Sequence, residues 1–404
     1  MGGAVVTGLG SIVGTGVFVS IAVSFGVWGR EALFAVPLAA LVATFNGLSS
    51  AQLAAVHPVS GGTYEYGYRF LSPWAGFSAG WLFLIAKTAS AATAAIGFAA
   101  YLADLLGAPS SLVVPIALGV SAAITGLVIT GIRRTALVNA ALVAITVGAL
   151  VTFIAAGLLE PTPDTSAVSV ARGSFSWTDL LAATAFLFVA YTGYGRIATL
   201  GEEVRDPAVT IPRAGVTTLA VSAALYTGVA IVVARLGGPD FTFEEGAAAL
   251  AELVGNPWVT IVEIGAIVAM AGVLLNLVLG LSRVWLAMGR RDDMPSILGR
   301  VSASGSPTPA VILTGIAVAG VAAVGDVRLT WSFSAFSVLL YYAITNAAAL
   351  RIPTEDRRFP RWVSWAGLGS CGFLSLWVDP AVLVVGVGVI VAGVGFRAVR
   401  QRFL

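Results

Sequence analysis

The chain has 404 residues, of which 58% are hydrophobic and only 10% are charged, and its formal net charge is +2. Because about a quarter of the residues of a soluble globular protein are charged, this composition excludes a large water-soluble domain and indicates an integral membrane protein. The single cysteine, Cys371, excludes an internal disulfide. No Gly-rich phosphate loop ending in Lys-Ser or Lys-Thr is present, which excludes an ATP-driven pump made of this chain alone.

Apolar stretches of about 20 residues, long enough to cross a bilayer, recur along the chain. We predict twelve crossings, at residues 4–25, 33–56, 74–103, 111–132, 135–159, 178–201, 214–236, 257–288, 308–325, 331–350, 362–378 and 380–397. Sixteen of the 22 basic residues then lie in loops on one side and four on the other. Lys and Arg prefer cytoplasmic loops, so we expect a multi-pass protein of the cell (plasma) membrane with both termini in the cytoplasm. The first crossing begins almost at the first residue, which leaves open that the natural chain starts earlier.

Two predicted crossings carry Gly and hydroxyl residues at mid-membrane depth. In the first, Gly10, Gly14 and Gly16 fall within seven residues, and the sixth contains the segment Tyr191-Thr192-Gly193-Tyr194-Gly195. Each Gly lowers helix stability by about 1 kcal/mol relative to Ala, so we predict that both helices open at these segments. Close packing of helices through small residues is the alternative explanation.

The two Gly-containing crossings occupy matching positions if crossings one to five and six to ten form two halves. An odd number of crossings per half gives the halves opposite orientations. The expected fold is therefore one transmembrane domain with an inverted repeat, residues 1–159 and 178–350, followed by two extra helices in residues 362–397. Open helix centres expose amides that attract an anion and carbonyls that attract an ammonium or a metal cation. A zwitterion satisfies both.

Several motifs resemble the amino acid, polyamine and organocation (APC) transporter superfamily, whose members share a five-plus-five inverted-repeat, leucine-transporter-like fold. The matching segments are residues 10–18, 58–66, 198–207, 210–213 and 282–292. The resemblance implies an amino acid permease, an all-α membrane protein with discontinuous helices 1 and 6. Such a protein is a secondary transporter that moves amino acids by alternating access.

The resemblance also implies substrate contacts from the open centres of these two helices. The substrate carboxylate is expected at the backbone amides of Thr15 and Gly16 and at the hydroxyl of Thr15. The carbonyl groups expected to hold the α-ammonium are those of Ile12, Val189 and Thr192. Tyr191, Tyr194 and the third crossing are expected in the cavity walls, where they would set side-chain selectivity.

Lys87 lies in the third predicted crossing, where an ionised side chain is energetically expensive and therefore a functional candidate. The resemblance places it in the wall of the substrate cavity. There it would either attract an acidic substrate side chain or load and release a proton. The alternative is a buried ion pair, for which Glu263 in the eighth crossing is the expected partner.

The sequence leaves the coupling ion open. Sodium-coupled relatives place carbonyls equivalent to those of Gly10 and Val13 opposite hydroxyl groups in crossing eight, but residues 270–276 offer only Asn276 and no hydroxyl. Thr146 lies near the position at which some proton-coupled relatives carry a lysine, and it could supply one oxygen. Sodium prefers oxygen ligands, so this site is a poor one for sodium, and the coupling is undecided among proton symport, exchange and facilitated passage.

Glu202 is a candidate for a gate-closing salt bridge with a cytoplasmic arginine, with simple solvation at the membrane interface as the alternative. An exchanger or an amino acid sensor without ion coupling is the alternative function. A membrane enzyme would need paired acids or histidine clusters within the crossings, which the sequence lacks, so no enzymatic activity is expected. The expected partners are an amino acid, the lipid bilayer and either a proton or sodium. We expect no metal site, cofactor or nucleic acid, and the oligomeric state is not indicated.

Overall fold

The computed structural model describes residues 1–59, 61–131, 136–161, 175–198, 204, 206–237, 248–302 and 305–402, and this part of the chain is helical without β-strands. The α-helices, in chain order, are α1 (Gly2–Ile12), α2 (Ile21–Trp28), α3 (Glu31–Val56), α4 (Thr63–Phe70), α5 (Pro73–Leu105), α6 (Val113–Ile129), α7 (Ala136–Leu159), α8 (Trp177–Tyr191), α9 (Gly195–Ala198), α10 (Pro207–Leu236), α11 (Ala249–Glu252), α12 (Trp258–Arg290), α13 (Thr308–Ala322), α14 (Val327–Ala349), α15 (Arg361–Leu374) and α16 (Pro380–Arg400). Two short elements matter for the site: the π-helix η1 (Gly16–Ser20) and the 3-10 turn η3 (Thr192–Tyr194).

Nine helical segments of the described residues are long and apolar enough to cross a bilayer, and a tenth span results if α1 and the bent segment Gly16–Trp28 are counted together. These ten match ten of the twelve predicted crossings. The other two predictions, residues 308–325 and 362–378, correspond to α13 and α15, which have only 15 and 14 residues. The multi-pass helical class is therefore confirmed, whereas the count of twelve is not.

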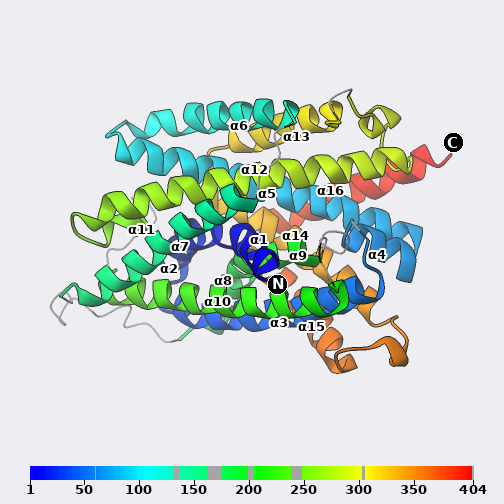
Figure 1. Cartoon of the computed structure of the whole chain (residues 1–404), viewed down its shortest axis with the longest axis horizontal. Coiled ribbons are helices and arrows are strands. Elements are labelled where there is room, and N and C mark those ends of the chain that lie inside the picture. Colours follow the sequence, from blue (N-terminus) through cyan, green and yellow to red (C-terminus); the bar gives the residue numbers. More distant parts are fainter. Residues whose placement is uncertain are drawn as a thin grey trace.

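The long helices form two groups (Figure 1). In one, α3 packs against both α8 and α10; in the other, α12 and α13 pack against α5, against α6 and against each other. In Figure 1, α3 and α10 run along the lower side of the molecule, whereas α6 and α13 form its upper edge. Helix α1 contacts α10 and η3 as well as α12, so it lies where the two groups meet. This arrangement brings the first Gly-containing crossing to the centre of the molecule.

Local sequence sets where several helices begin. At the start of α5, the Ser72 hydroxyl accepts a hydrogen bond from the Ala75 amide at 3.2 Å, and Pro73 occupies the first helical position. At the start of α16, the Asp379 carboxylate accepts from the amide of Ala381 at 2.8 Å, again with proline in the first turn. Proline suits this position because its missing N–H would have no partner there. The segment Asp379-Pro380 thus separates α16 from the helix before it, as the sequence predicts.

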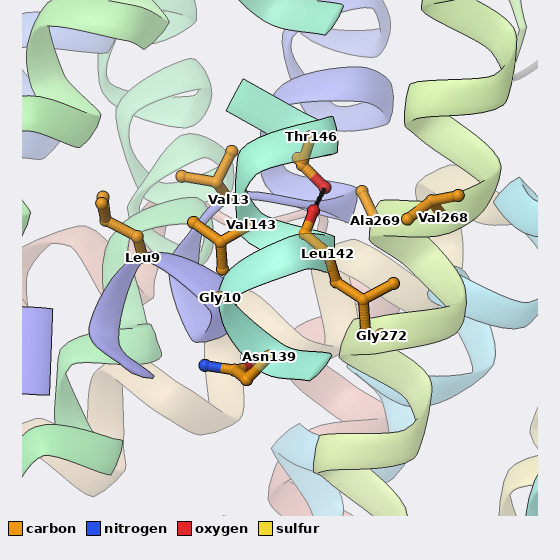
Figure 2. Close-up of a pocket in the computed structure, with 10 residues that line it drawn as sticks. All are labelled: Leu9, Gly10, Val13, Asn139, Leu142, Val143, Thr146, Val268, Ala269 and Gly272. Atoms are coloured by element: carbon orange, nitrogen blue, oxygen red, sulfur yellow. Dashed lines mark hydrogen bonds between the residues drawn. The ribbon is translucent and has the colours of Figure 1, made fainter. Parts of the chain in front are cut away.

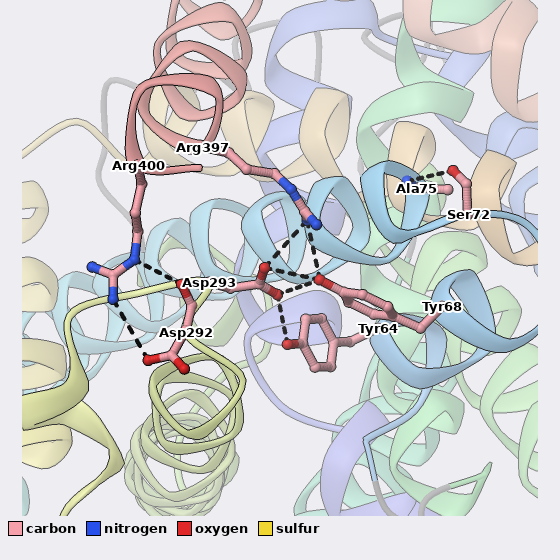
Figure 3. A network of polar contacts seen from close by, with 8 residues as sticks. All are labelled: Tyr64, Tyr68, Ser72, Ala75, Asp292, Asp293, Arg397 and Arg400. Carbon is pink, nitrogen blue, oxygen red and sulfur yellow. Dashed lines mark hydrogen bonds and ion pairs between the residues drawn. The ribbon is translucent and has the colours of Figure 1, made fainter. Parts of the chain in front are cut away.

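A buried charged cluster joins the C-terminal helix α16 to α4 and to the end of α12 (Figure 3). Arg397 pairs with Asp293 at 3.3 Å, and their side chains are only 4% and 6% exposed. The hydroxyls of Tyr64 and Tyr68 donate to the same carboxylate at 2.7 and 2.6 Å. Burial, together with the hydrogen bond to Asp293, raises the pKa of Tyr68 to about 12, so its hydroxyl stays protonated at neutral pH. We refer to these four residues as the Arg397 cluster.

Candidate substrate site

The first helix is interrupted after Ile12. Val13 has an extended backbone (φ −80°, ψ 106°), and the chain resumes helical structure at a bend of 41°. Within the described part of the chain, the amides of Gly14, Thr15 and Gly16 donate to no backbone carbonyl. The Thr15 hydroxyl is also buried without a hydrogen-bond partner there. The start of the second half of this helix therefore presents free donors at its positive dipole end.

The second Gly-containing crossing is interrupted more mildly. Helix α8 ends at Tyr191, one 3-10 turn follows over Thr192–Tyr194, and α9 continues as Gly195–Ala198. The axis is not bent enough to divide the span, because Trp177–Ile197 forms a single candidate crossing. The predicted opening of the sixth crossing is thus a tight turn between α8 and α9, whereas the first crossing is fully interrupted between α1 and η1.

The two interruptions touch through their backbones. A Cβ atom at Gly193 would lie 2.2 Å from the carbonyl oxygen of Ser11, and one at Gly16 would lie 2.7 Å from the Cα atom of Ala190. Such distances are far below van der Waals contact, so no larger residue fits at either position without separating the helices. Glycine at these two positions brings the exposed groups of both helices to the same place.

A cavity lies beside this contact, between the two interruptions, α5, α12 and α14. Its volume is about 40 Å³, counted as space open to the centres of water molecules, which is room for about three waters. The residues lining it are Ser11, Ile12, Thr15, Gly16, Lys87, Ser90, Val189, Ala190, Thr192, Gly193, Val273, Leu277 and Trp331. Six of the seven predicted substrate-binding residues are therefore brought together, and Tyr191 is the exception.

Tyr191 points toward α3 instead of lining the cavity. Its buried hydroxyl donates to the carbonyl of Val36 at 3.2 Å. Val189 and Thr192, three residues apart, share one face of the helix, whereas Tyr191 projects from another face. The cavity is also not lined by Tyr194, whose ring packs against that of Tyr342 at 5.3 Å. The expectation that both tyrosines form cavity walls is therefore corrected by the geometry.

Protein donors already occupy the three carbonyls predicted to hold an ammonium group. The Val189 oxygen accepts from both the amide and the hydroxyl of Thr192, and the Thr192 oxygen accepts from the Tyr342 hydroxyl and the Gly195 amide. The Ile12 oxygen accepts one hydrogen bond from the residues that the structure describes. Because a carbonyl oxygen has two lone pairs, Ile12 is the one of the three that keeps acceptor capacity for a substrate.

Sequence reasoning missed Tyr226 of α10. Its hydroxyl lies 2.7 Å from the carbonyl oxygen of Ile12 and 3.2 Å from that of Ala190, so it bridges both interruptions. The only signal in the sequence was a tyrosine inside a predicted crossing. Nothing in the sequence indicated which backbone groups that tyrosine contacts, because its partners are more than 30 residues away.

Replacing Tyr226 by phenylalanine is expected to lower stability and also to weaken substrate binding, because the hydroxyl that holds the Ile12 carbonyl in place against Ala190 is lost. The change leaves the Ile12 carbonyl without its donor, which costs about 1–3 kcal/mol for a buried group. Thermal unfolding in detergent and equilibrium amino acid binding measure the two effects. Tyr101→Phe is the matched control, since the Tyr101 hydroxyl donates to the carbonyl of Phe18 at 2.9 Å, outside the cavity. If both variants weaken binding equally, Tyr226 has no specific role at the site.

Lys87 reaches the cavity from α5. Its Nζ atom donates to the Thr192 hydroxyl at 2.9 Å. The alternative, a buried ion pair with Glu263, is wrong, because Glu263 lies beside Asp104 at the far end of α5. Asp104 follows Lys87 by 17 residues in one helix, a rise of about 26 Å. Among the residues that the structure describes, no carboxylate lies within 4 Å of the Lys87 ammonium group.

A smaller cavity, of about 10 Å³, lies between α1, α7 and α12 and has room for about one water molecule (Figure 2). It brings together three of the coupling candidates, Gly10, Val13 and Thr146. The Thr146 hydroxyl donates to the carbonyl of Leu142 in its own helix at 2.9 Å. The Asn276 amide donates to the Gly10 carbonyl at 3.4 Å and does not line this cavity. Glu202, the gating candidate, lies outside the described residues.

Comparisons with known proteins agree with this architecture. The family model described as amino acid permease matches residues 3–399. An uncharacterized transporter of Mycobacterium tuberculosis (strain ATCC 25618 / H37Rv) is 38% identical over 405 residues, which cover 98% of this chain and 90% of the relative.

Two proteins of Bacillus subtilis (strain 168) are more distant relatives. The branched-chain amino acid permease BcaP is 26% identical, over 73% of this chain and 67% of its own length. The methylthioribose transporter is also 26% identical, over 78% of this chain and 72% of its own length. With a family match along nearly the whole chain, this multi-pass membrane protein belongs to the amino acid permeases of the APC superfamily, which are transporters.

Proposed function

We propose that this protein is a secondary transporter that moves amino acids across the plasma membrane by alternating access. The observation that carries the proposal is the pair of opposite polar surfaces in the central cavity. On one side lie the backbone amides of Thr15 and Gly16 and the hydroxyl of Thr15, none of which has a partner among the described residues, and beside them lies the Ile12 carbonyl with acceptor capacity. A half-helix N-terminus attracts a carboxylate, and a free carbonyl attracts an ammonium group.

The proposed substrate contacts all come from the first interrupted helix. Thr15 and Gly16 bind the substrate carboxylate, and Ile12 binds the α-ammonium. The carbonyls of Val189 and Thr192 each accept two hydrogen bonds already, so in this conformation they stabilise the tight turn and line the cavity without binding the substrate. A relative named as a branched-chain amino acid permease supports an amino acid as the substrate class.

The size of the cavity supports a cycle of opening and closing. A space for about three water molecules is too small for a typical amino acid, so substrate binding requires helices or side chains to move. We propose that α1, α3, α8 and α10 rock as one group against α5, α6, α12 and α13. Residues 1–159 and 178–350 are proposed to be the two inverted repeats that permit this motion, with both termini in the cytoplasm.

The decisive experiment is a counterflow screen of the common amino acids in proteoliposomes, at two pH values and with or without sodium, beside a binding assay. Accumulation of labelled amino acids supports the proposal, and its dependence on pH or sodium identifies the coupling ion. Flux that occurs only against an internal amino acid indicates the alternative, an exchanger. Binding without flux indicates a sensor, and flux of methylthioribose without flux of any amino acid contradicts the proposed substrate class.

Thr15→Val tests the proposed carboxylate contact. A hydrogen bond to a charged group contributes about 1.5–3 kcal/mol, so we expect affinity for amino acids to fall by about 10- to 100-fold. The melting temperature should not fall, because the Thr15 hydroxyl has no partner among the described residues. Equilibrium binding and thermal unfolding give the two readouts. Thr15→Ser keeps the hydroxyl and should bind normally; unchanged affinity in Thr15→Val would rule the contact out.

A further inference from the structure

The Lys87 ammonium group is an uncompensated cation in the cavity wall. Its one hydrogen bond within the described chain goes to the neutral hydroxyl of Thr192, at 2.9 Å. An ammonium group has three donors, so two N–H bonds are left for another partner. No carboxylate of the described residues reaches it, and the acidic residue expected to do so, Glu263, lies near the far end of α5.

Within the described part of the chain, the surroundings of Lys87 offer hydroxyls and apolar groups but no negative charge. Ser90, one helical turn further along α5, bonds the hydroxyl of Ser334 at 2.7 Å. Val273, Leu277 and the ring of Trp331 complete this wall. A cation in such surroundings is strongly destabilised when unpaired, because hydroxyl dipoles replace only part of the lost hydration. The cavity therefore lacks one anion.

Charge balance favours one class of solute as the source of that anion. A neutral amino acid brings one positive and one negative group, so with Lys87 charged the occupied cavity keeps a net charge of +1. The Lys87 partner Thr192 also belongs to the turn next to which the substrate ammonium is proposed to bind, so two cations would lie close together. An amino acid with a second carboxylate removes the excess charge and separates the two cations. A basic amino acid would add a third.

We propose that Lys87 is a specificity-determining residue that pairs with a side-chain carboxylate and makes the carrier selective for acidic amino acids, aspartate and glutamate. This inference rests on the proposed function, because it assigns the α-carboxylate to Thr15 and Gly16 and the α-ammonium to Ile12. The second carboxylate then lies on the α5 side of the cavity. The neutral isosteres asparagine and glutamine lack the charge that Lys87 requires.

The test measures counterflow of labelled aspartate and glutamate beside asparagine and glutamine in proteoliposomes. The unchanged protein should prefer each acid to its amide by at least about tenfold, as expected for a hydrogen-bonded charge pair. Lys87→Met and Lys87→Gln should remove that preference while any uptake of the amides is kept or increased. Ser90→Ala is the matched control: it removes a hydroxyl from the same wall but no charge, and the acid-to-amide ratio should not change.

Each other outcome overturns the selectivity role. If the unchanged protein carries neutral amino acids and does not prefer the acids, Lys87 does not select the substrate, whereas the proposed function stands. If the Lys87 variants lose uptake of acids and amides equally, together with any dependence on a proton gradient, the lysine carries a proton instead. If no amino acid is taken up, the proposed function fails as well. Should neither variant fold, inhibition of labelled glutamate uptake by the unchanged protein is measured with unlabelled aspartate and with unlabelled asparagine. Stronger inhibition by aspartate supports the selectivity role, and equal inhibition contradicts it.

Discussion

Gly193→Ala is expected to abolish amino acid uptake. The added Cβ would lie 2.2 Å from the Ser11 carbonyl oxygen and 2.6 Å from the Ile12 amide nitrogen. Overpacking costs about 1–3 kcal/mol where side chains can yield, and more here because the obstructing atoms are backbone. This cost falls on the conformation in which the two helices touch, and each increment of about 1.4 kcal/mol lowers the population of that conformation tenfold. We therefore expect uptake to fall by more than about 100-fold. Initial uptake rates in proteoliposomes, normalised to the amount of folded protein, measure the effect.

Two further variants locate the cause of that loss. Gly16→Ala places a Cβ 2.6 Å from the Cβ and 2.7 Å from the Cα atom of Ala190, so it should show the same defect from the other helix. Gly280→Ala in α12 has no atom within 4 Å of the added Cβ and should transport normally. Normal transport by Gly193→Ala would mean that the close backbone contact is not needed for function.

Arg397→Met is expected to lower the stability of the protein by about 3–5 kcal/mol, because it leaves the buried Asp293 carboxylate without its counter-ion. The pair is nearly inaccessible, and Tyr64 and Tyr68 hold the same carboxylate, so water cannot easily replace the arginine. Neighbouring rings add to the loss: the Arg397 guanidinium lies 5.0 Å from the ring centre of Trp74. Thermal or denaturant unfolding in detergent measures the change.

The exposed ion pair beside the Arg397 cluster provides its control. Arg400 lies 3.8 Å from the carboxylate of Asp292, whose side chain is 61% exposed. Such a surface pair contributes at most about 1 kcal/mol, so Arg400→Met should change stability only slightly. Equal effects of the two arginine variants would show that burial does not strengthen the Arg397 pair. A large loss of stability in Arg397→Met but not in Arg400→Met would mean that α16, although outside the proposed repeat, stabilises the packing of α4 against the end of α12.

Much of the architecture could be predicted because membrane burial acts on each segment separately. Ten predicted crossings have counterparts of sufficient length, since apolar stretches of about 20 residues are recognisable one by one. Helix ends with local signals, such as Asp379-Pro380, were also placed correctly. Helix α10 begins at Pro207, seven residues before the predicted crossing, because a helix can extend beyond the bilayer and leave no mark in hydropathy.

The sequence by itself determined that the protein is embedded in a membrane, that glycines cluster in two crossings and which residues resemble a transporter family. Only the tertiary structure decided which polar groups of the site are free. The hydroxyls of Tyr226 and Tyr342 donate hydrogen bonds to carbonyls of the interrupted helices. The Lys87 ammonium group donates to the Thr192 hydroxyl and does not pair with Glu263. Composition and periodicity act along one segment, whereas a hydrogen bond between distant segments depends on how whole helices pack.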